Sequence, residues 1–108
     1  MKKIIIRDHV RFQSDKMAKI ALGATERALL DLYCVGPGQM QKAHTHDEQD
    51  KIYLVVEGRA RVSVGGAEDT LGPGEAVIAP AGVEHGLVND GPVEALVLVV
   101  VTPPPPHA

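Results

Sequence analysis

The chain has 108 residues, of which 44% are hydrophobic, 23% charged and 3% aromatic, and its formal net charge is -3. This length suits one domain with a single hydrophobic core. The negative charge and the scarcity of aromatic rings argue against a nucleic-acid partner, because polyanions bind basic surfaces and single-stranded bases stack on aromatic side chains.

The sequence shows neither an export signal nor a membrane span. Its first apolar run has three isoleucines and ends at Arg7, far short of a signal sequence. The longest apolar stretch, 95–101, is too short for a bilayer, which needs roughly 20 residues. A single cysteine, Cys34, excludes an internal disulfide and is typical of a reducing compartment. We therefore expect a cytoplasmic protein with no membrane partner.

Short segments rich in Val, Ile and Leu, separated by Gly or Pro, predict an all-β domain. The first expected element, 17–22, is a short strand or irregular edge, although its Ala, Leu and Lys content also permits a short helix. A further strand should lead into the His-Thr-His segment. The other expected strands, in chain order, are 28–35, 52–56, 59–64, 76–79 and 93–101. Gly65 and Gly66 predict a tight hairpin turn after 59–64.

The C-terminal residues 102–108 contain four consecutive prolines. Proline has no N–H to donate to a sheet and favours an extended polyproline II conformation. We therefore expect this tail to lie outside the sheets.

Three histidines stand out as candidate metal ligands. His44 and His46 are two residues apart, so on a strand both side chains point to one face and can chelate one ion. His85 lies in a second glycine-framed segment. Imidazole is a common protein ligand for Zn, Fe, Ni, Mn and Cu. Taken alone, however, a His-x-His pair also fits ordinary loop histidines.

The spacing of glycines around these histidines forms two motifs. The first contains Gly38, His44, His46 and Gly58, and the second contains Gly74, Pro80, Gly82, His85 and Asn89. This arrangement resembles the two-motif pattern of the cupin superfamily, and in particular small single-domain bacterial cupins of uncharacterised function. The resemblance covers about 29–101.

The resemblance implies a single all-β domain over 1–108. Its fold would be a cupin-type double-stranded antiparallel β-helix, a conical, jelly-roll-like β-barrel over about 29–101. N-terminal strands would lie within 1–28, and the proline-rich tail would occupy 102–108. The resemblance also implies that His44, His46 and His85 converge on one divalent transition metal ion in the lumen.

One position departs from the cupin pattern. The glutamate that usually serves as a fourth ligand would lie five residues after His46, where this chain has Lys51. An ammonium group cannot ligate a metal. Gln49 has the same strand parity as Lys51 and is the first candidate for the fourth ligand, ahead of water and then of Glu48 or Asp50.

Two interpretations of Lys51 remain open. It can line the substrate pocket, or its stem can line the barrel while its amine reaches solvent or pairs with Glu57 or another carboxylate. A site without the anionic ligand is more positive and should favour an anionic small molecule.

Other residues are assigned by parity and composition. Tyr53 and Met40 are expected to line the substrate pocket, although core packing with a satisfied hydroxyl fits Tyr53 equally well. We expect Asn89 to bond backbone groups at a turn and Cys34 to be a small buried hydrophobe. The remaining histidines, His9 and His107, should lie on the surface.

Two classes of function fit these residues. The first is a metal-dependent small-molecule enzyme such as a dioxygenase, or an isomerase or decarboxylase, with an ion that offers open coordination positions. The second is a barrel that binds a small ligand or metal without turning it over. We also expect a homodimer, in which the apolar segment 4–12 pairs with a partner's sheet edge.

Overall fold

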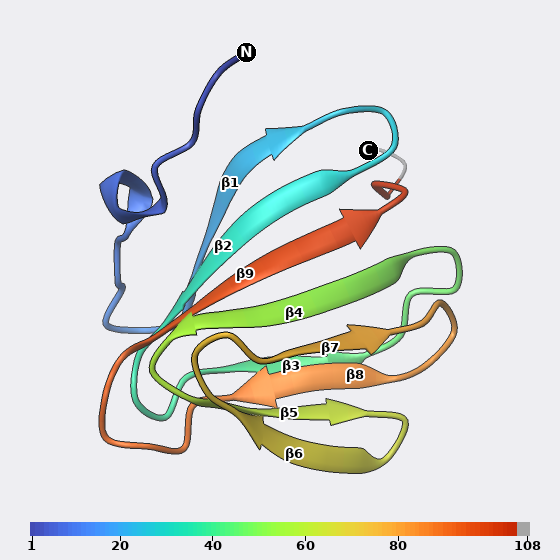
Figure 1. Cartoon of the computed structure of the whole chain (residues 1–108). Coiled ribbons are helices and arrows are strands. Elements are labelled where there is room, and N and C mark those ends of the chain that lie inside the picture. Colours follow the sequence, from blue (N-terminus) through green and yellow to red (C-terminus); the bar gives the residue numbers. More distant parts are fainter. Residues whose placement is uncertain (106–108) are drawn as a thin grey trace.

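The computed structural model describes residues 1–105, which form two antiparallel sheets facing each other. One sheet has the order β1-β2-β9-β4-β7, and the other has the order β3-β8-β5-β6 (Figure 1). The strands are β1 (Ala18–Ala24), β2 (Leu29–Val35), β3 (Met40–His44), β4 (Asp50–Glu57), β5 (Ala60–Val64), β6 (Ala67–Leu71), β7 (Ala76–Ala79), β8 (His85–Val88) and β9 (Ala95–Thr102). This arrangement confirms the predicted all-β, jelly-roll-like barrel.

The predicted strands agree closely with the observed ones where the sequence is apolar, as in β2, β5 and β7. The ambiguous segment 17–22 belongs to β1, which pairs antiparallel with β2, so sheet pairing overrides its helical propensity. β6 and β8 were not among the predicted strands. The first is mostly exposed and polar in composition, and the second is short and contains Gly86.

Alternation along β2 divides the apolar residues between two clusters. Tyr33 and Val35 face the lumen, where they join side chains from both sheets in the main core. Leu32 and Cys34 face outward and belong to a second, outer cluster. Cys34 is fully buried there, as predicted, and burial raises the pKa of its thiol. One layer of backbone therefore separates the lumen from the outer cluster.

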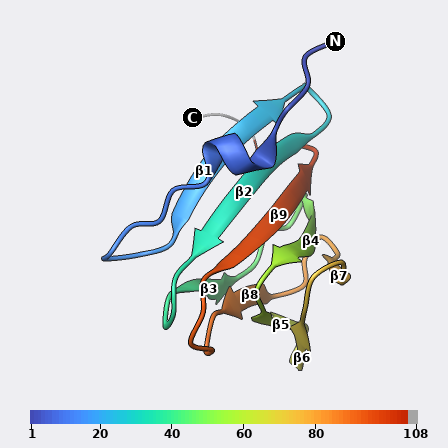
Figure 2. The same cartoon turned by 60° about the vertical axis from the view of Figure 1, so that its left-hand side comes forward.

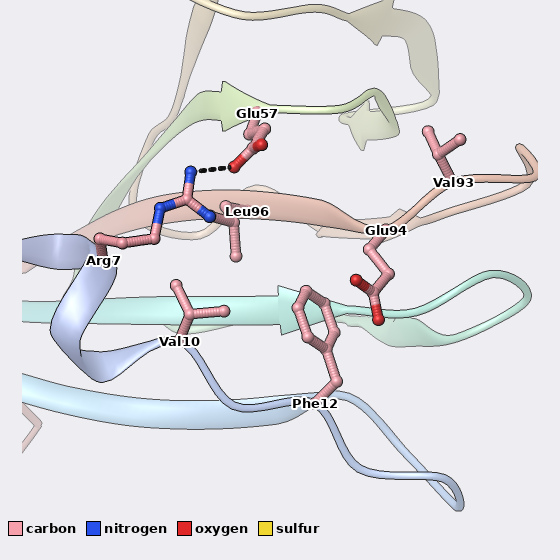
Figure 3. A pocket seen from close by; sticks show the side chains of 7 residues that line it. All are labelled: Arg7, Val10, Phe12, Glu57, Val93, Glu94 and Leu96. Carbon is pink, nitrogen blue, oxygen red and sulfur yellow. Dashed lines mark hydrogen bonds and ion pairs between the residues drawn. The ribbon is translucent and has the colours of Figure 1, made fainter.

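The N-terminal segment covers this outer cluster (Figure 2). Its short 3-10 helix η1 (Ile6–His9) precedes Val10 and Phe12, which pack against the sheet. Arg7 Nη2 lies 2.7 Å from Glu57 Oε2, beside a cavity of about 240 Å³ (Figure 3). Residues 1–28 thus contain one strand, β1, where the sequence predicted several.

The same packing bears on the expected homodimer. The segment 4–12 forms no strand in the single chain, and its Ile6, Val10 and Phe12 pack against the chain's own sheet, whereas Ile4 and Ile5 are exposed. Pairing of this segment with a partner's sheet edge is not observed in the single chain and stays a prediction. Dimerisation itself stays a prediction.

The turns follow the sequence prediction. Gly65 and Gly66 have φ angles of 59° and 86°, which suit a tight hairpin between β5 and β6. Asn89 is buried and uses its side-chain amide at a turn, donating to the carbonyls of Val35 and Val93 at 2.9 and 2.8 Å. Its predicted structural role is confirmed.

The tail follows β9, and residues 103–105 lie outside the sheets. The rest of the predicted polyproline segment, and with it His107, falls beyond the described residues, whereas His9 is exposed as predicted. Within 1–105, no helix is long and apolar enough to cross a membrane.

Candidate metal centre

Strands β3 and β8 bring the three histidines together. Their register places His44 directly opposite His85. The ring centroid of His44 lies 4.4 Å from that of His85 and 4.7 Å from that of His46, and one nitrogen of each ring lies within 4.8 Å of the other two. Nitrogens that bind one ion at about 2.0–2.1 Å lie about 3–4 Å apart. The three nitrogens therefore lie close to the separation that one shared ion requires.

The backbone holds these rings in orientation. His44 Nδ1 lies 2.9 Å from the carbonyl oxygen of Lys42, and His85 Nδ1 lies 2.9 Å from that of Val83. Each Nδ1 must carry a proton to donate to a carbonyl, which leaves Nε2 with a free lone pair. In addition, the Gly82 amide donates to the carbonyl of His46 at 2.8 Å and ties the two histidine loops together.

The chemistry of the site fits a metal ion. Among the described residues, His85 Nε2 is the one buried side-chain nitrogen or oxygen without a hydrogen-bond partner. Burial lowers the pKa of both His46 and His85, with help from neighbouring cations, so both imidazoles favour the neutral, ligating form. His44, His46 and His85 thus form a group that could hold a metal ion.

An irregularity in β3 changes which residues face the lumen. The register with β8 shifts between Gln41 and His44, so both residues face inward although their numbers differ in parity. The parity argument that placed Met40 beside His44 therefore fails. Met40 is 56% exposed, on the outer side of β3, and Gln41 takes the inner place. No simple sequence signal marks this bulge.

Gly86 permits the close approach of the two strands. A Cβ at this position would lie 2.8 Å from the carbonyl oxygen of Gln41 and 2.9 Å from Cα of Ala43. These are backbone atoms, which cannot move aside without displacing β3. Glycine inside a strand often marks such an approach of two backbones.

Substituting alanine for Gly86 should therefore push β3 away from β8 and separate His44 from His85. We expect metal affinity to fall about 10–100-fold, the loss typical when the support of a ligand is removed. Competition titration with a coloured chelator measures the change. Gly23→Ala is the matched control, since this glycine also lies in a strand and its added Cβ would meet only Cδ1 of Ile4, at 3.9 Å. An unchanged affinity for Gly86→Ala would contradict the role of this contact.

A polar wall, defined as Tyr33, Gln41, Lys51 and Tyr53, lines the lumen. Lys51 is only 3% exposed, with Nζ 3.3 Å from Tyr33 Oη and 3.5 Å from Gln41 Oε1. Tyr53 Oη donates to Gln41 Oε1 at 2.7 Å, and Gln41 Nε2 donates to Tyr33 Oη at 3.0 Å. Tyr53 is thus a core residue with a satisfied hydroxyl, and its ring centroid lies 6.2 Å from that of His85.

The interpretation of Lys51 as a residue that reaches solvent is therefore wrong, and so is its pairing with Glu57. The amine is held inside by Tyr33 and Gln41, while Glu57 lies on the outer side and pairs with Arg7. In the described part of the chain, no carboxylate lies within ion-pair distance of Lys51 Nζ.

Burial dominates the electrostatics of this wall. It lowers the pKa of Lys51 to about 8, with a further lowering by Lys19 and an opposing effect of Asp31. It raises the pKa of Tyr33 to about 12 and also raises that of Tyr53, so both hydroxyls stay protonated at neutral pH. The buried carboxyl of Asp31 also has a raised pKa because of burial, although Lys19 and Lys51 oppose the shift.

The candidate fourth ligands lie just before β4 and at its first residue. Gln49 is 7% exposed and directly precedes this strand. Glu48 and Asp50 are exposed, and Asp50 Oδ1 accepts a hydrogen bond from the Ala81 amide at 2.9 Å. Gln49 is thus the buried residue among these three candidates, and its role as the fourth ligand stays a prediction.

Comparison with known proteins identifies the family. A model described as the cupin domain matches residues 31–101. The chain belongs to the cupin family.

Three known proteins are similar to this cupin over most of its length. The crystal structure of TT1209 from Thermus thermophilus is 45% identical, with a TM-score of 0.94, and the match covers 97% of this chain and 100% of that one. Tetracenomycin polyketide synthase protein TcmJ from Streptomyces glaucescens is 32% identical over 97 residues, covering 79% of this chain and 65% of TcmJ. Mannose-1-phosphate guanylyltransferase ManC from Salmonella typhimurium is 32% identical over 73 residues, covering 68% of this chain. The matched part is only 15% of ManC.

Proposed function

We propose that this cupin holds one divalent transition metal ion through His44, His46 and His85 and acts on a small molecule as a metal-dependent enzyme. The observation that carries the proposal is the buried Nε2 of His85, which has no hydrogen-bond partner in the described chain and lies beside two further imidazoles. Three neutral nitrogen donors suit Fe, Ni, Mn, Zn or Cu.

A bound ion of this kind supplies Lewis-acid chemistry or, with Fe, reaction with dioxygen. A dioxygenase, an isomerase and a decarboxylase are all compatible with this donor set. Gln49 is the proposed fourth ligand, because it is the buried oxygen donor of the candidate set. Three imidazoles and one amide are four ligands, so an ion that takes five or six ligands keeps positions for a substrate.

The chain's own residues supply the wall that a substrate would meet. The hydroxyls of Tyr33 and Tyr53 stay protonated, and the amine of Lys51 is fixed among them. These groups can orient a polar substrate and exclude water from it. They do so from strands of a rigid sheet rather than from loops.

A second candidate function is a barrel that binds its ligand without turning it over. It is favoured by the hydrogen bond from Tyr53 to Gln41, which engages the hydroxyl that could otherwise act as a proton donor to a substrate. The similarity to TcmJ, a polyketide synthase protein by name, agrees with a role in small-molecule chemistry but does not separate the two candidates.

Metal analysis tests the proposal. Protein purified without a histidine tag is reconstituted anaerobically with Fe, Ni, Mn or Zn, desalted, and measured by inductively coupled plasma mass spectrometry. We expect about one equivalent of at least one ion, with tighter binding in the wild type than in Gln49→Ala and no change in Glu48→Ala. Absence of a stoichiometric metal under every condition would refute the proposal. Oxygen uptake with candidate substrates then separates oxidation from binding alone.

A further inference from the structure

We infer that the ligand of this site is a small organic anion with two oxygen donors, one for the metal ion and one for Lys51. The inference rests on the proposed function, because one end of the ligand requires the ion. It goes further by assigning Lys51 as the residue that selects the charge of the ligand.

Lys51 is incompletely paired. Its ammonium group has three N–H donors, but the hydrogen-bond acceptors beside it are two neutral oxygens at 3.3 and 3.5 Å, near the long limit of a hydrogen bond. It also lies 5.7 and 5.6 Å from the ring centroids of Tyr33 and Tyr53, which stabilise a cation without carrying a negative charge. Only 3% of the residue is exposed, so water offers little compensation. Burial of a cation without an anionic partner is unfavourable. An anion beside Nζ would supply the missing partner.

The charges around the site add up to a positive balance. Lys19, an exposed residue of β1, adds another cation, with Nζ 5.7 Å from the ring centroid of Tyr33. The buried carboxyl group of Asp31 offsets part of the charge of the two lysines. A divalent ion held by neutral imidazoles would add two positive charges without an anionic ligand to offset them. The site as a whole therefore favours a ligand with negative charge.

The two ends of the site share one aromatic neighbour. The ring centroid of Tyr53 lies 6.2 Å from that of His85 and 5.6 Å from Lys51 Nζ. A ligand that joins the metal centre to the amine would therefore lie along this ring. The hydrogen bonds among Tyr33, Gln41 and Tyr53 hold this wall in a fixed geometry.

Malonate, a small dicarboxylate, and malonamide, its neutral isostere, provide the probes. Isothermal titration calorimetry on the metal-loaded protein measures the affinity for each, and the metal content is measured on the same samples. We expect the wild type to prefer malonate at least about 10-fold, because a hydrogen bond to a charged group contributes that much or more. Lys51→Met keeps the charge of the ion, so this preference should shrink about 10-fold rather than vanish, whereas Lys3→Met, which removes an exposed amine, should leave it unchanged.

Lys51→Glu distinguishes an effect of residue 51 on metal binding from an effect on anion binding. It places a carboxylate among the candidate ligands, so metal binding should be kept or strengthened while malonate binding falls about 10-fold or more. Equal affinity of the metal-loaded wild type and Lys51→Met for malonate would overturn the inference and leave the proposed metal site intact. Equal affinity of the wild type for malonate and malonamide would also overturn the inference and leave the proposed metal site intact. A wild type that takes up no metal would instead overturn the proposed function, and this inference with it.

Discussion

Replacing Lys51 by methionine should raise the free energy of unfolding of the metal-free protein by about 3 kcal/mol at pH 7. Folding lowers the pKa of this amine from 10.5 to about 8, and each unit corresponds to about 1.36 kcal/mol. Methionine has a similar length and no charge, so the penalty disappears while the lumen stays filled. Urea unfolding followed by circular dichroism measures the difference.

The difference in unfolding free energy between Lys51→Met and the wild type should depend on pH in a defined direction. Between about pH 8 and 10.5 the unfolded chain keeps the Lys51 proton while the folded chain releases it, so the stability of the wild type rises with pH. Below about pH 8 the full penalty is present, and above 10.5 it is gone. The advantage of Lys51→Met should therefore shrink as the pH increases from about 8 towards 10.5.

A comparison of the two proteins removes contributions that they share. Folding raises the pKa of Tyr33 from 10.0 to about 12, so the stability that its protonated hydroxyl contributes is lost as the pH rises above 10.0. The measurements should therefore stop at about pH 9.5. Lys16→Met is the control for the loss of one exposed lysine. A wild type as stable as Lys51→Met at pH 7 would mean that the buried ammonium group has a partner not seen in this structure.

Replacing His85 by alanine should abolish stoichiometric metal binding. His85 supplies the most buried nitrogen of the three, and His44 and His46 alone leave only two ligands. We expect a loss greater than the roughly 10–100-fold that follows removal of an outer hydrogen-bond partner. Metal content after reconstitution and desalting measures it.

His9→Ala is the matched control, because it removes an exposed histidine outside both motifs and should retain the full metal content. His46→Ala provides a second test at a more accessible ligand in case His85→Ala affects folding. Circular dichroism of each variant establishes that the sheets persist. Full metal occupancy in folded His85→Ala would exclude the three-histidine centre.

The sequence predicted those parts of the molecule that depend on local pattern. Apolar runs with Gly or Pro boundaries marked β2, β5 and β7, and spacing marked the three histidines and the inward position of Lys51. The role of Asn89 followed from turn chemistry. In each of these cases the residue's neighbours along the chain carry the information.

Residues whose roles depend on contacts between distant strands were missed. Gln41 faces the lumen because of the bulge in β3, which alternation alone cannot reveal. Tyr33 contacts Lys51, and Asp31 comes near enough to affect its pKa, only after β2 and β4 pair with opposite edges of β9. Gly86 did carry a signal, since a glycine inside a strand and beside a metal ligand often indicates close backbone contact. Asp31, a carboxylate within an apolar strand, was a second such signal.

The single layer of backbone between the lumen and the outer cluster has a consequence for how ligand preference can change. Tyr33 and Cys34 are consecutive, yet one belongs to the wall beside Lys51 and the other lies beneath the N-terminal segment. A substitution in Val10 or Phe12 that shifts β2 moves Tyr33 as well. A change in the N-terminal segment can therefore alter the shape of the site through the position of Tyr33, although no residue of this segment contacts the ligand.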